Sequence, residues 1–144
     1  MARLEAAVRG LQVRHEALRT RFEVMEGVLM QCPCSPGVQP KVERVLGEDE
    51  LQQRCVACAR TPFDLRAGPA WRAWLFLHGD EATLLLGTHH IVSDGWSSGI
   101  LIRDLAALYS DGDLPESPLQ YGDFCEWEGE QEHGEELGWW EEEL

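Results

Sequence analysis

Two adjacent histidines, His89 and His90, are followed by Asp94 and Gly95, a spacing that could serve acid–base or positioning chemistry. An imidazole can accept a proton near neutral pH or orient a nucleophile through a hydrogen bond. Asp94 could orient an imidazole, pair with an arginine that holds the loop, or cap a following helix. Gly95 allows a tight bend before that helix. No serine or cysteine lies in a nucleophile-elbow context, which favours direct transfer between two bound substrates over a covalent acyl-enzyme.

The histidines are expected where a strand ends and a helix is about to begin. Residues 70–77 and 82–90 predict a β-hairpin with a turn at 79–80. Because side chains alternate along a strand, His89 and His90 should face opposite ways, one toward a cavity and one packed underneath. The same alternation argues against both being ligands of one metal ion.

The remaining elements follow from apolar periodicity and from Gly and Pro. They are helices over 3–19, 48–60, 96–109 and from 121 onward, a strand over 22–31 turning at 26–27, a loop over 32–37 and a strand over 41–46. His15 lies on the apolar stripe of the first helix and is expected to be a hydrogen-bonded core residue. Helices and strands without regular alternation predict an α/β fold, an α+β two-layer sandwich.

The chain has 144 residues, enough for one domain, and a formal net charge of −14. Residues 121–144 hold ten acidic and no basic side chains, which indicates a solvated helix face or, alternatively, a docking surface for a basic partner. The excess of acidic over basic side chains argues against a nucleic-acid partner, since binding to phosphates needs a basic surface. No apolar run approaches the roughly 20 residues that span a bilayer, and no secretory signal begins the chain. We therefore expect a cytoplasmic protein with no membrane partner.

Five cysteines without an export signal indicate free thiols in a reducing compartment. Cys32, Cys34, Cys55 and Cys58 could form a structural zinc site. Their spacing fits poorly, because one pair lies inside a helical stretch and the other is separated by a single residue. We expect no bound metal.

Three ordered motifs resemble those of condensation domains from nonribosomal peptide synthetases. Residues 14–22 (RHEALRTRF) resemble the RHExLRTxF motif, residues 88–97 (THHIVSDGWS) the HHxxxDG signature, and residues 121–127 (YGDFCEW) the YxDFxxW motif. Residues 62–65 and 68–72 also match the spacing expected between the first two motifs. The similarity runs over nearly the whole chain.

This resemblance implies half of a chloramphenicol acetyltransferase-like fold, with a mixed, largely antiparallel sheet and flanking helices. Residues 1–144 would be the N-terminal half, without the opening motif and the C-terminal half. The implied activity is that of an acyltransferase of peptide biosynthesis: a carrier-bound aminoacyl amine attacks a carrier-bound acyl thioester. Phosphopantetheine would tether both substrates to peptidyl carrier domains, beside an adenylation domain, with no cofactor bound directly.

The resemblance also assigns roles to individual residues. His90 would face the channel and Gly95 would lie close to the reacting centre. His89 would be structural, and Trp96 and Ser97 would support the loop as members of the same motif. The residues after Gly95 favour condensation over epimerization, and the two histidines exclude heterocyclization, whose domains replace both by aspartate.

Asp94 is implied to hold the loop through an ion pair, with Arg14 or Arg19 as candidate partners. Two other functions stay open: an inactive half-domain that acts as a protein-interaction module or relic, and a zinc domain. A half-domain would leave its channel open to water and expose an apolar face. We therefore expect this piece to be inactive alone, and to be poorly soluble or to self-associate.

Overall fold

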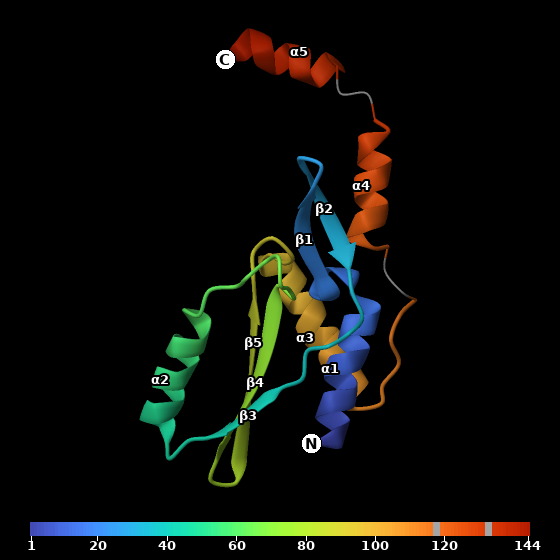
Figure 1. Ribbon diagram of the computed structural model, residues 1–144. Helices are drawn as coiled ribbons and strands as arrows, with labels where there is room; N and C mark the ends of the chain where they lie inside the picture. The colour runs from blue at the N-terminus through green and yellow to red at the C-terminus, as the bar shows by residue number, and fades with distance from the viewer. Residues whose placement is uncertain (117–118, 132–133) are drawn as a thin grey trace.

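A three-stranded sheet with helices on both faces carries the core (Figure 1). The structure is a computed structural model that describes residues 1–116, 119–131 and 134–144. The strands are β3 (Lys41–Arg44), β4 (Trp71–His78) and β5 (Glu81–Thr88), in the order β3-β4-β5, with β3 parallel and β5 antiparallel to β4. Helices α1 (Ala2–Arg14) and α3 (Gly95–Tyr109) cover one face, and α2 (Glu48–Ala59) covers the other.

The expected mixed α/β class with largely antiparallel strands is confirmed, but the number of layers differs. Alternation along β4 points Trp71 and Ala73 toward α1 and α3, whereas Trp74 and Phe76 pack with α2. Both faces of this sheet are thus buried, and α2 adds a third layer to the predicted two. Phe76 is fully buried, so the apolar residues of this hairpin form the core rather than an open interface.

A second hairpin, β1 (Thr20–Met25) and β2 (Val28–Pro33), projects beyond the main sheet (Figure 1). Its turn was predicted at Glu26 and Gly27, and both residues have positive φ, 52° and 82°, as a two-residue type I′ turn requires. Strand β2 continues into the predicted loop over 32–37. The exposed apolar side chains of the described residues include those of this hairpin, namely Val24, Met25, Val28, Leu29 and Met30.

The first helix ends earlier than its periodicity predicts. His15 leaves the helical conformation (φ −115°, ψ 100°), and a separate 3-10 turn, η1 (Glu16–Arg19), follows. Leu18 is 1% exposed, so the apolar stripe continues across a break that periodicity cannot reveal. The predicted helix over 3–19 was therefore wrong in its last turn. Likewise, β5 ends at Thr88 rather than at the expected residue 90.

The last two helices extend away from the sheet (Figure 1). They are α4 (Tyr121–Gly129) and α5 (Gly134–Glu143). On α4 the aromatic side chains of Tyr121, Phe124 and Trp127 are 45–56% exposed, beside solvated acidic residues. Residues 132–133, within the helix predicted from residue 121 onward, lie outside the described residues. Among the described residues, no helix has the length and apolarity needed to cross a membrane.

Because one face of α1 packs against the sheet, substitutions at a buried and at an exposed position of this helix should differ in their effect on stability. Leu11 is 0% exposed and belongs to the core, whereas Val13 is 59% exposed. Leu11→Ala should lower the free energy of unfolding by about 2–5 kcal/mol, because it leaves a cavity among α1, α3 and β4. Val13→Ala should change it by less than about 0.5 kcal/mol. Urea denaturation followed by circular dichroism measures both, and equal effects would contradict this placement of α1.

Candidate active site

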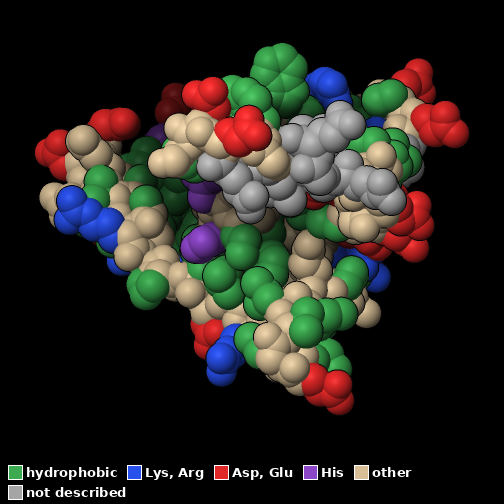
Figure 2. All heavy atoms as spheres, turned by 90° about the horizontal axis from the view of Figure 1, so that it is seen from above, with side chains coloured by type: hydrophobic (Ala, Val, Ile, Leu, Met, Phe, Trp, Pro, Cys, Tyr) green, Lys and Arg blue, Asp and Glu red, His purple; other side chains and the backbone are tan. Residues whose placement is uncertain are grey.

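A cavity of about 600 Å³ lies where the loop after β5 meets η1, the base of the β1–β2 hairpin and the start of α4. His90 and the loop from Ile91 to Asp94 line one side, and Phe22 and Tyr121 belong to the other elements around it. Figure 2 shows histidine side chains among hydrophobic ones on this face, with acidic side chains nearby. His90 itself is exposed, so the cavity is open to solvent.

The two histidines separate as strand alternation predicts. The amide of His89 donates to the carbonyl of Ala70 (2.8 Å), which extends the β4–β5 ladder by one residue. The His89 ring packs edge-on against Phe63, with ring centroids 6.0 Å apart, whereas His90 lines the cavity. His90 therefore lines the cavity, whereas the His89 ring packs against the segment between α2 and β4.

Asp94 is the N-cap of α3. Its Oδ1 accepts hydrogen bonds from the backbone amide of Ser97 (2.7 Å) and from the Ser97 hydroxyl (2.6 Å). The hydroxyl bond first, and then the amide bond, hold the pKa of Asp94 below its usual range. Of the roles considered for Asp94, the helix cap is the one the structure shows. The cap fixes where the His90 loop ends and α3 begins.

The predicted ion pair between Asp94 and Arg14 or Arg19 is not formed among the described residues. Arg14 pairs with Asp104 (2.8 Å), and Arg19 pairs with Glu16 (2.6 Å) while donating to the Cys34 carbonyl (2.9 Å). The physical reason is that each group has a partner elsewhere. Asp94 is satisfied by the first turn of its own helix, and both guanidinium groups are held by other acceptors.

Gly95 and Trp96 differ from the roles expected of them. Gly95 starts α3 without a left-handed φ, and a Cβ added there would meet no atom within 4 Å. Neither the backbone conformation nor a close neighbour among the described residues therefore requires glycine at this position. Trp96 is 84% exposed and does not support the loop, whereas Ser97 does so through the Asp94 cap.

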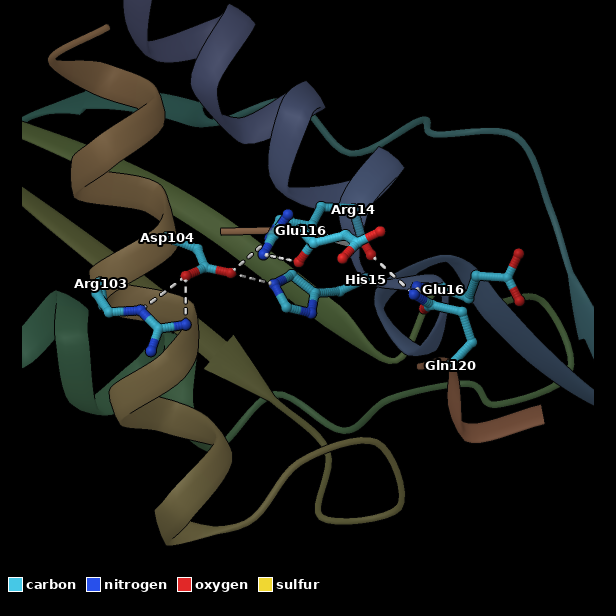
Figure 3. Close-up of polar contacts among 7 residues, drawn as sticks. All are labelled: Arg14, His15, Glu16, Arg103, Asp104, Glu116 and Gln120. Carbon is cyan, nitrogen blue, oxygen red and sulfur yellow. Dashed lines mark hydrogen bonds and ion pairs between the residues drawn. The ribbon is translucent and has the colours of Figure 1, made fainter. Parts of the chain in front are cut away.

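A fully buried carboxylate on α3 bonds His15, which lines the cavity (Figure 3). Asp104 on α3 accepts hydrogen bonds from Arg14 (2.8 Å), from His15 Nε2 (2.9 Å) and from Arg103 (2.7 Å). Burial alone would raise the pKa of Asp104, but the bonds from Arg103, Arg14 and His15 together lower it. His15 was predicted to be a hydrogen-bonded core residue, and this contact confirms it.

Gln120 joins the third motif to the first. Its Oε1 accepts from the amide of Glu16 (2.8 Å), and its Nε2 donates to the carbonyl of Arg14 (3.2 Å). Asp123 accepts from the Gln120 amide (2.9 Å), which completes a capping box at the start of α4. The segments around residues 15, 104 and 120 thus meet at one junction, although they are far apart in sequence (Figure 3).

Sequence analysis missed Asp104, Arg103 and Gln120. One signal was available for Asp104, because it shares the helical stripe of Leu101 and Leu105 and is a charged residue at a core position. A charged residue there needs an ionic partner. For Gln120 the sequence holds no comparable signal.

The four cysteines of the zinc hypothesis are not brought together. Cys32 lies on β2, Cys34 follows it, and Cys55 and Cys58 lie on α2. Burial raises the pKa of the Cys58 thiol above its ordinary value. Within the described ranges, no group of three or more His, Cys, Asp or Glu side chains is arranged to hold a metal ion.

The model of the condensation domain family matches residues 1–144, and the three motifs that meet around the cavity lie within this match. The chain belongs to the condensation domain family. It corresponds to an N-terminal portion of that domain. The expected chloramphenicol acetyltransferase-like fold class is confirmed by its structural neighbours.

Three relatives illustrate the similarity of this condensation-domain chain. Bacitracin synthase 3 of Bacillus licheniformis is 43% identical over 128 residues, covering 88% of this chain and 2% of the relative. The X-domain of teicoplanin biosynthesis, solved in complex with OxyB, has a TM-score of 0.74 at 32% identity, covering 89% of this chain and 30% of that one. The condensation domain of the monacolin K polyketide synthase MokA has a TM-score of 0.78 at 22% identity, covering 90% and 30%.

The chain spans only a small part of its curated relatives, between 1% and 14% of their length in those compared. It also spans about a third of the solved domains. The chain therefore corresponds to only part of each of these solved domains.

The buried Asp104 predicts a pH-dependent contribution to stability. Its pKa is lowered on folding, so its contribution is present above about pH 4 and is lost as the pH falls through the lowered pKa. Asp104→Asn should destabilise the fold by about 3 kcal/mol at pH 7, because Arg14 and Arg103 lose their counter-charge. The difference in the free energy of unfolding between this variant and the unmodified chain should become smaller as the pH falls below about 4 and the Asp104 carboxylate becomes protonated. Thermal unfolding across pH measures this, with the exposed Asp113→Asn as the control; a pH-independent difference would contradict it.

The Asp94 cap predicts a graded response to substitution. Asp94→Ala removes the acceptor of the Ser97 amide and should lower the thermal midpoint of unfolding. Asp94→Ser retains an oxygen acceptor and should recover most of the loss. The amide hydrogen exchange of Ser97 should rise in the alanine variant and much less in the serine variant. Equal exchange in the two variants would show that the side chain does not cap α3.

Proposed function

We propose that this chain forms the histidine side of a condensation site that joins two carrier-bound substrates. The acceptor's amine nitrogen attacks the carbonyl carbon of the donor thioester, so a C–N bond forms and the C–S bond breaks. The amine gives up one proton, and the departing phosphopantetheine sulfur takes one to become a thiol. The acyl or peptidyl group ends on the acceptor carrier.

The observation that supports this proposal is the position of His90. It lines the cavity from a loop whose two ends are fixed, by His89 at the end of β5 and by the Asp94 cap at the start of α3. The three family motifs surround the same cavity. An imidazole on an anchored loop beside a cavity of this size suits positioning chemistry.

His90 need not be a strong base in this reaction. An α-amine has a pKa of about 7.7–8.0, so an appreciable neutral fraction exists at physiological pH. His90 orients the amine, takes its proton, or stabilises the charged tetrahedral intermediate. Each role requires the imidazole to point into the cavity.

The proposal includes partners that the relatives suggest. Peptidyl carrier domains would deliver both substrates on phosphopantetheine, and an adenylation domain would load the acceptor. No cofactor or metal would be bound directly by this chain. Because such a synthetase uses activated amino acids, we expect the transfer reaction to take place in the cytoplasm.

A second candidate function is a docking module without transfer activity. The X-domain of teicoplanin biosynthesis was solved in complex with OxyB and is 32% identical to this chain. Together with the exposed aromatic side chains on α4, this favours protein binding as the alternative. A docking module would not depend on His90.

Substitution of His90 separates the two candidates. In a whole condensation domain containing this chain, His90→Ala should reduce single-turnover transfer between two loaded carriers by at least about a hundredfold, because the amine loses its positioning group. Radiolabelled acyl transfer to the acceptor carrier measures this, with circular dichroism to verify folding. His78→Ala, on β4 and outside the lining of the cavity, is the matched control. Undiminished transfer by His90→Ala would remove His90 from the reaction.

A further inference from the structure

We propose that Phe63, held in place by Arg72, is a positioning residue for the His90 loop and acts through the His89 ring. The effect on transfer depends on the function proposed above, whereas the effect on His89 does not. Phe63 lies in the connection between α2 and β4, outside the cavity lining.

Arg72 anchors the segment that carries Phe63. Its Nη1 donates to the carbonyl of Thr61 (3.0 Å) and its Nη2 to the carbonyl of Pro62 (2.6 Å). The guanidinium carbon lies 4.1 Å from the centroid of the Phe63 ring, within the range of a cation–π contact. The strand residue therefore fixes both the backbone before Phe63 and the ring itself.

The sheet brings this pair to His89. Arg72 is opposite Gly87 in the β4–β5 register, and His89 follows two residues later, so Arg72 and His89 share the face covered by α2. The Phe63 and His89 rings are perpendicular, at 90°, with centroids 6.0 Å apart. This edge-to-face arrangement is a favoured aromatic geometry and limits rotation of the imidazole.

The orientation of the His89 ring controls the turn that carries His90. The His89 Nδ1 accepts a hydrogen bond from the amide of Ile91 (3.0 Å), and its carbonyl accepts from the amide of Val92 (3.1 Å). An Nδ1 that accepts carries no proton, so the neutral ring is protonated at Nε2. Rotation of the His89 ring would break its hydrogen bond to the Ile91 amide. His90 lies between His89 and Ile91, so this bond holds the backbone on both sides of it. Phe63 thus influences His90 through one imidazole and one backbone bond.

The first experiment observes this chain directly, by ¹⁵N NMR of its imidazoles and of the Ile91 amide. In the unmodified chain, His89 should show an unprotonated Nδ1 and a protonated Nε2. Phe63→Leu should move both nitrogens toward values averaged between tautomers and increase hydrogen exchange at Ile91. Phe63→Tyr keeps the ring and should restore the original signals. Unchanged His89 signals in Phe63→Leu would overturn the proposal.

A second variant keeps the test valid if Phe63→Leu fails to fold. Arg72→Lys retains the charge but cannot hold the carbonyls of Thr61 and Pro62 with a planar fork. It should shift the His89 signals in the same direction as Phe63→Leu. His78→Ala, whose ring bonds Thr83 on the same hairpin, should leave them unchanged.

The second experiment measures transfer in a whole condensation domain. Phe63→Leu should lower kcat about tenfold with KM for the acceptor carrier within about twofold, since it disturbs the placement of His90 rather than carrier binding. Phe63→Tyr should recover most of kcat. Altered His89 signals with unchanged kcat would overturn the positioning role. Undiminished transfer by His90→Ala would instead overturn the proposed function while leaving the NMR result intact.

Discussion

The carboxylate of Asp104 is the interaction on which the arrangement of this chain depends. It is 0% exposed, and a charge removed from water at this position would be very unfavourable without its three donors. Those donors come from the end of α1 and from α3, so the ionic contact fixes the two helices against each other. Asp94 begins the same helix ten residues earlier, or about 15 Å along its axis. The ionic contacts of Asp104 set the position of α3, and the N-cap of α3, Asp94, is also the end of the His90 loop.

Strand alternation provides the second constraint. Because β4 and β5 are covered on both faces, successive residues must enter different environments. At the end of β5 this places His89 beside Phe63 on the α2 side and leaves His90 for the cavity. The tandem histidines thus differ in their surroundings, since His89 holds the backbone by hydrogen bonds while the exposed His90 lines the cavity.

Local features were readable from the sequence, and long-range polar contacts were not. The turns at 26–27 and 79–80, the helices starting at Glu48 and near Trp96, and the separation of His89 from His90 follow from local chemistry, and all occur. The break after Arg14 was missed because Leu18 keeps the apolar period through a 3-10 turn. The ion pair expected for Asp94 was wrong because the Ser97 hydroxyl and amide supply a partner within one helical turn. Arg14 and Asp104 are 90 residues apart in sequence. The one sequence signal for their contact was the charge of Asp104 at a position within an apolar helical stripe.

The exposed state of His90 sets a physical limit on what this side of the domain can do alone. Hydrogen bonds and charges that orient an amine are weakened by bulk water, whereas in a closed site they act at low dielectric. The chain spans about 30% of the solved domains it matches, and apolar side chains of the β1–β2 hairpin and of α4 lie exposed. Hydrogen bonds of His89 and Asp94 hold the two ends of the His90 loop, whether or not water is excluded from His90. The position of this loop is therefore set by local contacts at its two ends and does not depend on how far His90 is exposed to solvent.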